Sequence, residues 1–278
     1  MIRTYPHGVT CWIDTEQPDP AAAAAFYAGL FGWTLSDAVP PGVPGSYLIA
    51  TLDGQDVAAI GPGGDPGAGP PAWHTYVAVD DADAAAARVP GLGGTVVSGP
   101  EDAGPGGRTA ACTDPQGAPF RLWQARRRPG AQLTNTPGTW NFSDLHTPDR
   151  AAAMAFYGPL FGWRDADMAQ DAGVMLQVPG YGDHLAATVD PGIHERQAFA
   201  PPGFADVIGG LLVTAGEPAH WHVVFTVTDR DDSAATAEQL GATVLRSTED
   251  TWTRTALLRD PQGAEFTVSQ FAPPDLGG

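Results

Sequence analysis

Hydrophobic and polar residues follow the same order twice along the 278-residue chain. Each half opens with an extended, largely apolar run, CWID at 11–14 and NFSDL at 141–145. An aspartate and an Ala-rich segment follow, and together they predict a helix with an aspartate N-cap. Short apolar runs divided by Gly and Pro come next, as in SYLIATLDG at 46–54 and VMLQVPGYG at 174–182. These runs predict strands, so each half begins as a βαβββ module.

A second cycle of the same kind completes each half. It starts with the predicted strands WHTYVAV at 73–79 and WHVVFTV at 221–227, and a second Asp-capped helix and further strands follow. Strands outnumber helices, which favours an α+β fold with helices on one face of a mostly antiparallel sheet. The other face of each sheet can then curl into a cup.

Recurring motifs indicate that the whole unit is duplicated. FYAGLFGW at 26–33 returns as FYGPLFGW at 156–163, and DPQGA at 114–118 returns at 260–264. The FY and FGW residues are predicted to be core, and Asp114 and Asp260 are predicted to form turns. The predicted division is a first domain at 1–124, a linker at 125–138, and a second domain at 139–278 with a longer hairpin insertion around 183–219.

This order of strand, Asp-capped helix, FY, FGW and Asp-Pro-x-Gly resembles the vicinal oxygen chelate superfamily of glyoxalases, bleomycin resistance proteins and extradiol dioxygenases. Tandem actinobacterial members are the most similar in organisation. The resemblance implies two domains, each a curved sheet built from paired βαβββ modules. The resemblance does not identify the activity of this chain, because the superfamily includes isomerases, lyases, dioxygenases and proteins that only bind a drug.

The resemblance also implies where a divalent metal would bind. Relatives take ligands from the first, fifth and last strands of a domain, and the matching positions here are Trp12, His74 and Arg121 in the first half and Phe142, His222 and Thr267 in the second. Only the two histidines are good ligands. No cofactor is therefore expected, and a divalent metal held through His74 or His222 is kept as the alternative.

Alternation along the predicted strands gives the residues that face each cup. The first set is Trp12, Asp14, His74, Tyr76, Arg121 and Trp123, and the second is Phe142, Asp144, His222, Val224, Thr267 and Ser269. The first set combines stacking surfaces with a carboxylate, an imidazole and a guanidinium, which suits a planar organic ligand. Two plainer interpretations stay open, an internal Asp14–Arg121 ion pair and histidines retained for packing.

Three functions follow from these residues. The first is an enzyme acting on an aromatic or polyketide-like metabolite, an isomerase, cyclase or lyase in which Asp14 and His74 are acid and base and Arg121 steadies a developing anion. The second is a metabolite-binding or self-resistance protein that sequesters its ligand. The third is a metal-dependent lyase or dioxygenase.

Charge and hydropathy limit the partners of the protein. A formal charge of −18 disfavours nucleic acid and anionic membrane surfaces, and no run of apolar residues is long enough for a membrane helix. A small organic molecule and a cytoplasmic location are expected. We also expect a monomer or weak dimer, because the fused copies supply a contact that single-copy relatives obtain by association.

Overall fold

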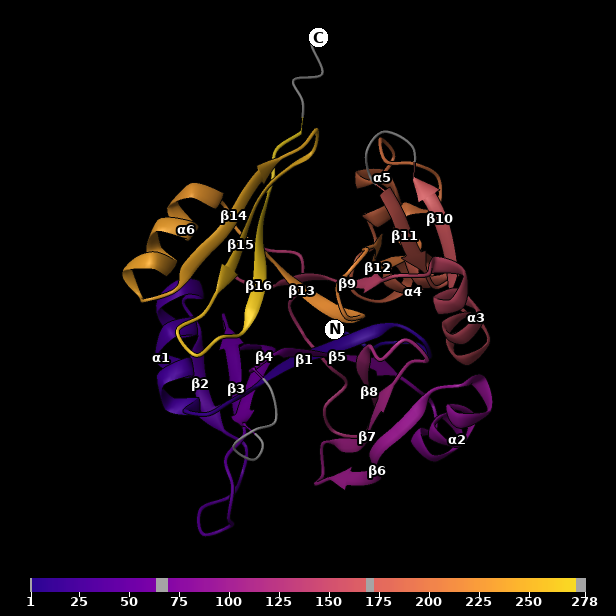
Figure 1. Cartoon of the computed structure of the whole chain (residues 1–278), viewed down its shortest axis with the longest axis horizontal. Helices are drawn as coiled ribbons and strands as arrows, with labels where there is room; N and C mark the ends of the chain where they lie inside the picture. Colours follow the sequence, from indigo (N-terminus) through magenta and orange to yellow (C-terminus); the bar gives the residue numbers. More distant parts are fainter. Residues whose placement is uncertain (1, 64–69, 169–172, 274–278) are drawn as a thin grey trace. The chain divides into compact units, whose positions relative to one another are not determined.

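The computed structural model describes residues 2–63, 70–168 and 173–273, and these residues form four modules (Figure 1). The first contains β1 Thr10–Gln17, α1 Pro20–Phe31, β2 Thr34–Asp37, β3 Leu48–Leu52 and β4 Gln55–Pro62. The second contains β5 Trp73–Ala78, α2 Ala82–Arg88, η1 Pro90–Leu92, β6 Thr95–Ala103, β7 Gly107–Thr113 and β8 Pro119–Ala125.

The third and fourth modules repeat this plan. The third contains β9 Trp140–Thr147, α3 Arg150–Phe161, β10 Arg164–Met168, β11 Gly173–Gln177, α4 Tyr181–Thr188, α5 Ile193–Arg196, η2 Phe204–Asp206 and β12 Val207–Val213. The fourth contains β13 His220–Thr226, α6 Arg230–Gln239, β14 Thr243–Glu249, β15 Thr253–Arg259 and β16 Glu265–Phe271. No helix in these described ranges has the length and hydropathy needed to cross a membrane.

The strands form two eight-stranded mixed sheets. Their orders are β2-β3-β4-β1-β5-β8-β7-β6 and β10-β11-β12-β9-β13-β16-β15-β14, so each sheet uses two successive modules in the same arrangement. Within a module the first and last strands pair in parallel, as β1 does with β4, and the other strand pairs of each module are antiparallel. The predicted α+β fold of tandem domains with paired βαβββ modules is confirmed.

Local chemistry explains where the first helix of each half begins and ends. The Asp19 carboxylate accepts hydrogen bonds from backbone N–H groups in the first turn of α1, and Asp149 does the same for α3. Both helices end at a glycine in the left-handed conformation, Gly32 at φ 74° and Gly162 at φ 76°. The glycine of FGW is therefore a helix C-cap.

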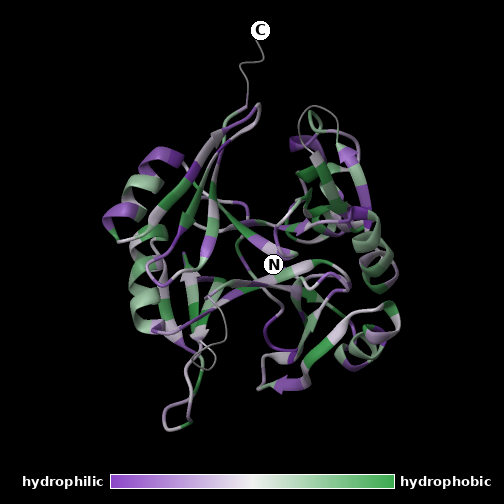
Figure 2. Cartoon of the chain, in the orientation of Figure 1, coloured by the Kyte–Doolittle hydropathy of each residue, from purple (hydrophilic) through white to green (hydrophobic). Residues whose placement is uncertain are grey.

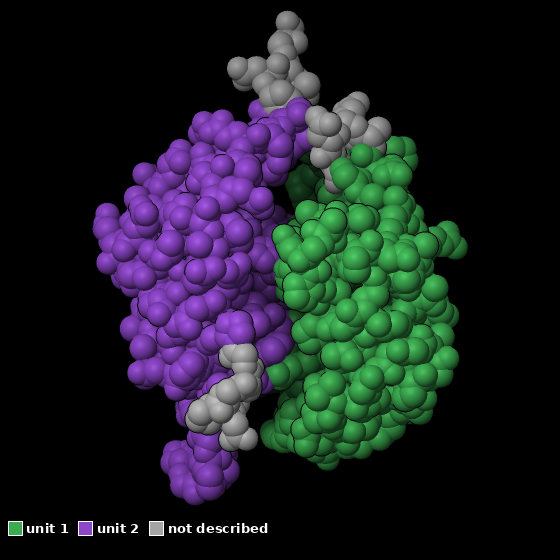
Figure 3. Space-filling view, in the orientation of Figure 1, with its two compact units in different colours: residues 1–12, 75–130, 142–221 green, residues 13–74, 131–141, 222–278 purple. Residues whose placement is uncertain are grey.

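By contact density the chain divides into two compact units (Figure 3). Unit 1 comprises residues 1–12, 75–130 and 142–221, and unit 2 comprises residues 13–74, 131–141 and 222–278. Each unit thus draws on one module from each half of the sequence. In Figure 2 much of α6, in unit 2, is hydrophilic, and this helix buries the small residues Ala234 and Ala237.

The core of unit 2 is aromatic and includes the first copy of the repeated motif. The rings of Tyr27 and Trp33 are stacked with centroids 5.8 Å apart, and Trp73 meets Tyr27 edge-on at 5.2 Å. All three side chains are buried. The prediction that FY and FGW are core is confirmed.

Unit 1 has an equivalent core around the second copy. Tyr157 stacks on Trp163 with centroids 4.9 Å apart, and Trp221 meets Tyr157 edge-on at 5.8 Å.

The DPQG aspartates are turn formers, as predicted, since Asp114 Oδ1 accepts hydrogen bonds from the backbone N–H groups of Gln116 and Ala118.

The insertion in the third module contains the helices α4 and α5 and the short η2. Val207–Val213, within the predicted hairpin insertion, forms strand β12 and pairs with β11 and β9. The first five residues of its apolar run VIGGLLV are buried in the sheet.

Candidate functional site

Strand β1 presents different chemistry on its two faces. Gln17 points into the core of unit 2, where its Nε2 donates to Asp260 Oδ2 at 2.9 Å. Because side chains alternate along a strand, Asp14 and Glu16 lie on the opposite face. Two carboxylates therefore lie beside each other on one side of β1.

Asp14 is almost completely buried, at 1% exposure, and has a phenol as a partner. The Tyr47 hydroxyl donates to Asp14 Oδ2 at 2.9 Å. The Tyr47 backbone is itself held, because its N–H donates to Asp37 Oδ1 at 3.0 Å and its carbonyl accepts from Ala38 N at 2.9 Å. These bonds fix the tyrosine as it enters β3 and so fix the phenol against Asp14.

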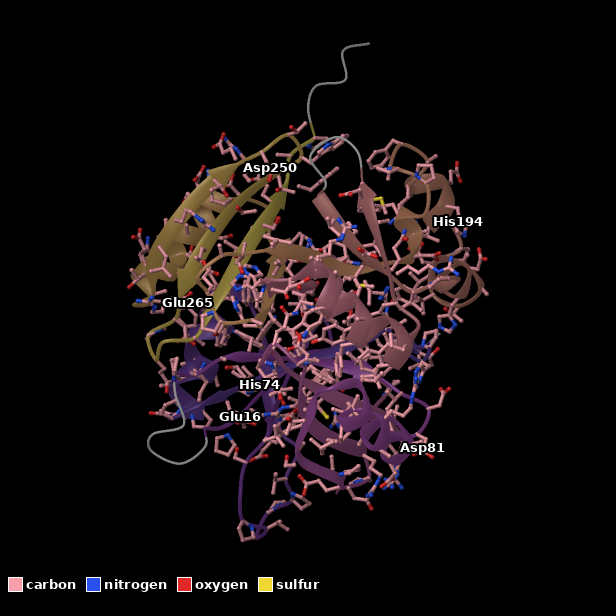
Figure 4. All side chains as sticks on the ribbon, turned by 45° about the vertical axis from the view of Figure 1, so that its right-hand side comes forward. Glu16, His74, Asp81, His194, Asp250 and Glu265 are labelled. Carbon is pink, nitrogen blue, oxygen red and sulfur yellow. The ribbon has the colours of Figure 1, made fainter. Side chains whose placement is uncertain are left out.

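Glu16 and His74 form the second pair of this cluster (Figure 4). His74 Nε2 lies 3.9 Å from Glu16 Oε2, with the side chains 20% and 37% exposed respectively. Gly61 on β4, the register partner of Glu16, lies beneath the cluster: a Cβ there would be 3.5 Å from the Tyr47 ring and 4.0 Å from Glu16 Cγ. We call Asp14, Glu16, Tyr47 and His74 the acid–base cluster of unit 2.

Unit 1 holds the aromatic residues and the arginine that were predicted for the first half. Tyr76 on β5 and Arg121 on β8 are register partners, and Arg121 Nη1 donates to the Tyr76 hydroxyl at 3.0 Å. The guanidinium carbon lies 5.5 Å from the Tyr76 ring centroid, and Trp123 meets that ring edge-on at 6.1 Å. Trp12, also in this unit, is 8% exposed.

The residues predicted for the second half have polar partners within their own units. In unit 1, Asp144 Oδ1 accepts from Gly210 N at 2.8 Å, and burial raises the pKa of this carboxyl to about 6. Phe142 is half-buried in the same unit. In unit 2, His222 Nε2 and Thr267 Oγ1 are hydrogen-bonded at 2.8 Å.

The positions that would hold the family metal do not fit one. Trp12 and Phe142 have no coordinating atom, and the Arg121 cation hydrogen-bonds a phenol. Thr267 uses its hydroxyl for His222. The described residues instead bring three candidate ligands together elsewhere in unit 1, namely His146, Glu217 and His220.

Two members of the acid–base cluster were missed by the sequence analysis. Glu16 continues the alternation of Trp12 and Asp14, so extending that pattern by one step would have found it. Tyr47 stands in a predicted strand segment, and no local signal indicated that its hydroxyl reaches Asp14.

Comparison with known proteins agrees with this architecture. The model of the glyoxalase/bleomycin resistance protein/dioxygenase superfamily matches residues 17–122, and that of the glyoxalase-like domain matches residues 142–269. A protein of Mycobacterium tuberculosis named "Putative glyoxylase CFP32" is 40% identical over 275 residues, 97% of each chain. The chain belongs to the glyoxalase/bleomycin resistance protein/dioxygenase superfamily.

Other proteins similar to this chain have names that state different roles. The anthracycline biosynthesis protein DnrV of Streptomyces peucetius is 36% identical over 285 residues, covering 98% of this chain and 96% of DnrV. Among solved structures, the Mn(II)-bound glyoxalase from Novosphingobium aromaticivorans aligns with a TM-score of 0.59 at 17% identity, over 95% of this chain and 83% of that one.

The 2,3-dioxygenase LapB from Pseudomonas sp. KL28 aligns with a TM-score of 0.60 at 12% identity, over 98% and 96% of the two chains. At such identities the structural matches establish the fold alone.

Proposed function

We propose that the chain is an enzyme of small-molecule metabolism that applies acid–base chemistry to an aromatic, polyketide-like metabolite, as an isomerase, cyclase or lyase. The observation that supports this most is the acid–base cluster of unit 2. A buried carboxyl bonded to a phenol, next to an imidazole beside a second carboxyl, is a set of groups that can accept and return protons.

Each side chain of the cluster has a proposed role. His74 is the proton donor, since the Glu16 carboxylate 3.9 Å away would stabilise the imidazolium form that a donor requires. Asp14 is the base, and the Tyr47 hydroxyl holds its carboxylate in one orientation. In an isomerisation, the base removes a proton from carbon beside a carbonyl, the electron pair moves to the carbonyl oxygen, and the acid returns a proton to another carbon.

Arg121 is proposed to stabilise the negative charge that develops on that oxygen. Arg121 Nη1 donates to the Tyr76 hydroxyl, and a guanidinium cation can stabilise an anionic oxygen by its charge. Trp12, Tyr76 and Trp123 are proposed to bind a planar ligand by stacking, with Phe142, Asp144, His222 and Thr267 as ligand-binding residues of the second half.

The proposed substrate class is supported by a relative. DnrV, 36% identical over 98% of this chain, has a name that places it in anthracycline biosynthesis. Anthracyclines contain a planar fused-ring system with carbonyl and hydroxyl groups. Such a ring system offers stacking surfaces for the aromatic residues and acidic C–H and O–H groups for the acid–base cluster.

Sequestration of a metabolite is the second candidate function. The edge-on pair of Tyr76 and Trp123, with the Arg121 cation over the Tyr76 ring, is sufficient to bind an aromatic ligand without any proton transfer. For sequestration, His74 needs only to contact the ligand. Removal of its imidazole should therefore lower turnover if the chain is an enzyme, and should lower only ligand affinity if the chain sequesters a metabolite.

Native mass spectrometry of freshly purified protein tests the substrate class directly, because a co-purified aromatic metabolite would support it. Calorimetric titration with alizarin, a hydroxylated anthraquinone, gives an affinity for a defined probe. With an identified metabolite, conversion to a product of equal mass or with loss of a small molecule supports the enzyme. Tight binding without conversion supports sequestration.

A further inference from the structure

Three side chains able to coordinate a metal ion gather in unit 1, at the end of β9 and the start of β13. They are His146, Glu217 and His220, and one candidate ligand atom of each lies within 4.8 Å of the other two. His146 Nδ1 is 3.8 Å from Glu217 Oε2. The two imidazole rings have centroids 4.5 Å apart and are inclined by 42°.

A hydrogen bond to the backbone orients the His220 ring and selects the tautomer that can bind a metal through Nε2. Its Nδ1 lies 2.9 Å from the Pro218 carbonyl oxygen. A carbonyl oxygen only accepts, so Nδ1 carries the proton and Nε2 keeps its lone pair. A histidine oriented by a backbone carbonyl in this way is a common arrangement around protein-bound metals.

The His146 side chain is held more rigidly than the Glu217 side chain. The His146 side chain is 18% exposed and projects from a strand, whereas the Glu217 side chain is 58% exposed. Ligands at about 2.0–2.2 Å from a tetrahedral ion are roughly 3.3–3.6 Å apart. The 3.8 Å between His146 and Glu217 can contract to that value by a small movement of the exposed carboxylate.

Two imidazole nitrogens and a carboxylate oxygen supply three donor atoms to a divalent ion, and the carboxylate also supplies a negative charge. Nitrogen and oxygen donors of this kind favour zinc and similar transition ions over magnesium or calcium.

We propose that His146, Glu217 and His220 bind one divalent transition-metal ion, such as Zn²⁺. The site differs from the superfamily position, since His146 follows Phe142 by four residues along β9 and His220 precedes His222 by two along β13. Three protein ligands leave a coordination position for water or for an oxygen of a bound molecule. The proposal is independent of the acid–base cluster, which lies in unit 2.

Cobalt titration of the full-length protein tests this site. After removal of metals with EDTA and of EDTA by dialysis, Co²⁺ is added while visible absorption and heat are recorded. We expect one equivalent to bind with visible bands of a site having fewer than six ligands, and Zn²⁺ to displace it. His146→Gln and His220→Gln should each weaken binding at least about 100-fold, since changes to residues that merely support a ligand already cost about 10–100-fold.

Two variants separate this site from others. His194→Gln removes an exposed histidine whose Nε2 is 3.1 Å from Asp183, and it should bind Co²⁺ as the unaltered chain does. His222→Gln reports on the superfamily position. Loss of binding in His222→Gln but not in His146→Gln would overturn the proposal, and so would no binding or equal weakening in His194→Gln. If His146→Gln fails to fold, Glu217→Gln decides, because its exposed side chain contributes little to folding.

Discussion

The Tyr27 hydroxyl donates a hydrogen bond of 2.9 Å to Asp260 Oδ2, although the two residues are 233 positions apart. The same hydroxyl accepts from Trp73 Nε1 at 3.1 Å, and the same carboxylate oxygen accepts from Gln17 Nε2 at 2.9 Å. All of these groups are buried. The recurring tyrosine of FY is thus bonded to the recurring aspartate of DPQG from the other half of the sequence.

Tyr27→Phe is expected to lower the free energy of unfolding by about 1–3 kcal/mol, because it leaves a buried carboxylate oxygen and an indole N–H each short of one partner. Urea unfolding followed by tryptophan fluorescence measures the change. Tyr157→Phe removes the corresponding hydroxyl of unit 1, which accepts from Trp221 Nε1 at 3.2 Å, and should also lower the free energy of unfolding. Unaltered stability in both variants would show that these bonds contribute little.

His74→Gln is expected to lower the turnover of an identified substrate roughly 100-fold or more with little change in ligand affinity, as loss of a general acid requires. His194→Gln is the control, because that histidine is exposed in the inserted segment. If affinity falls instead and there is no catalytic step to lose, the sequestration function is supported. If neither rate nor affinity changes, His74 is a packing residue.

Tyr47→Phe is expected to lower kcat about 10-fold or more while leaving the ring in place, because Asp14 loses the hydroxyl that orients its carboxylate. Measuring kcat and KM separately, with thermal unfolding as a check on folding, distinguishes this from loss of binding. An unchanged kcat would remove Tyr47 from the proposed mechanism.

Arg108→Gln is expected to destabilise the protein more at pH 7 than at pH 3. Arg108 forms two bonds with Asp83, of 2.7 and 2.8 Å, and its hydrogen bonding holds the pKa of the Asp83 carboxyl below its usual range. A carboxyl with a lowered pKa in the folded state contributes stability above its unfolded value of about 4 and loses that contribution as the pH falls further. The difference between the urea midpoints of the two proteins should therefore be smaller at pH 3 than at pH 7.

The chain is expected to sediment as a monomer of 28.9 kDa or as a weak dimer, since the duplicated modules supply contacts that separate copies would otherwise provide. Sedimentation velocity over a range of protein concentrations measures this. An obligate higher oligomer would contradict the expectation.

Features set by local chemistry could be predicted from the sequence. Asp19 and Asp149 cap helices because a carboxylate satisfies the first N–H groups of any helix, whatever the rest of the chain does. Strand alternation likewise grouped Trp12 with Asp14 on one face of the predicted strand, since the two-residue period of a strand is local.

Features that need distant partners could not be predicted. The bond from Tyr47 to Asp14 depends on the register of β3 against β4 and of β4 against β1, which no run of residues near Tyr47 encodes. The apolar run at Val207–Val213 was ambiguous for a related reason. Hydrophobicity indicated that it is packed, but only the pairing with β11 and β9 makes it a sheet strand.

The composition of the two units has a consequence for synthesis on the ribosome. Unit 1 ends at Trp221, so all of its segments are synthesised before the rest of the second half. Unit 2 begins at Ile13 and needs His222 and the residues after it, including Asp260 for Tyr27. Phe26 and Tyr27 of α1 therefore lack their contacts with Phe266 until more than 200 further residues have been translated, a period in which a nascent chain is exposed to aggregation and depends on chaperones.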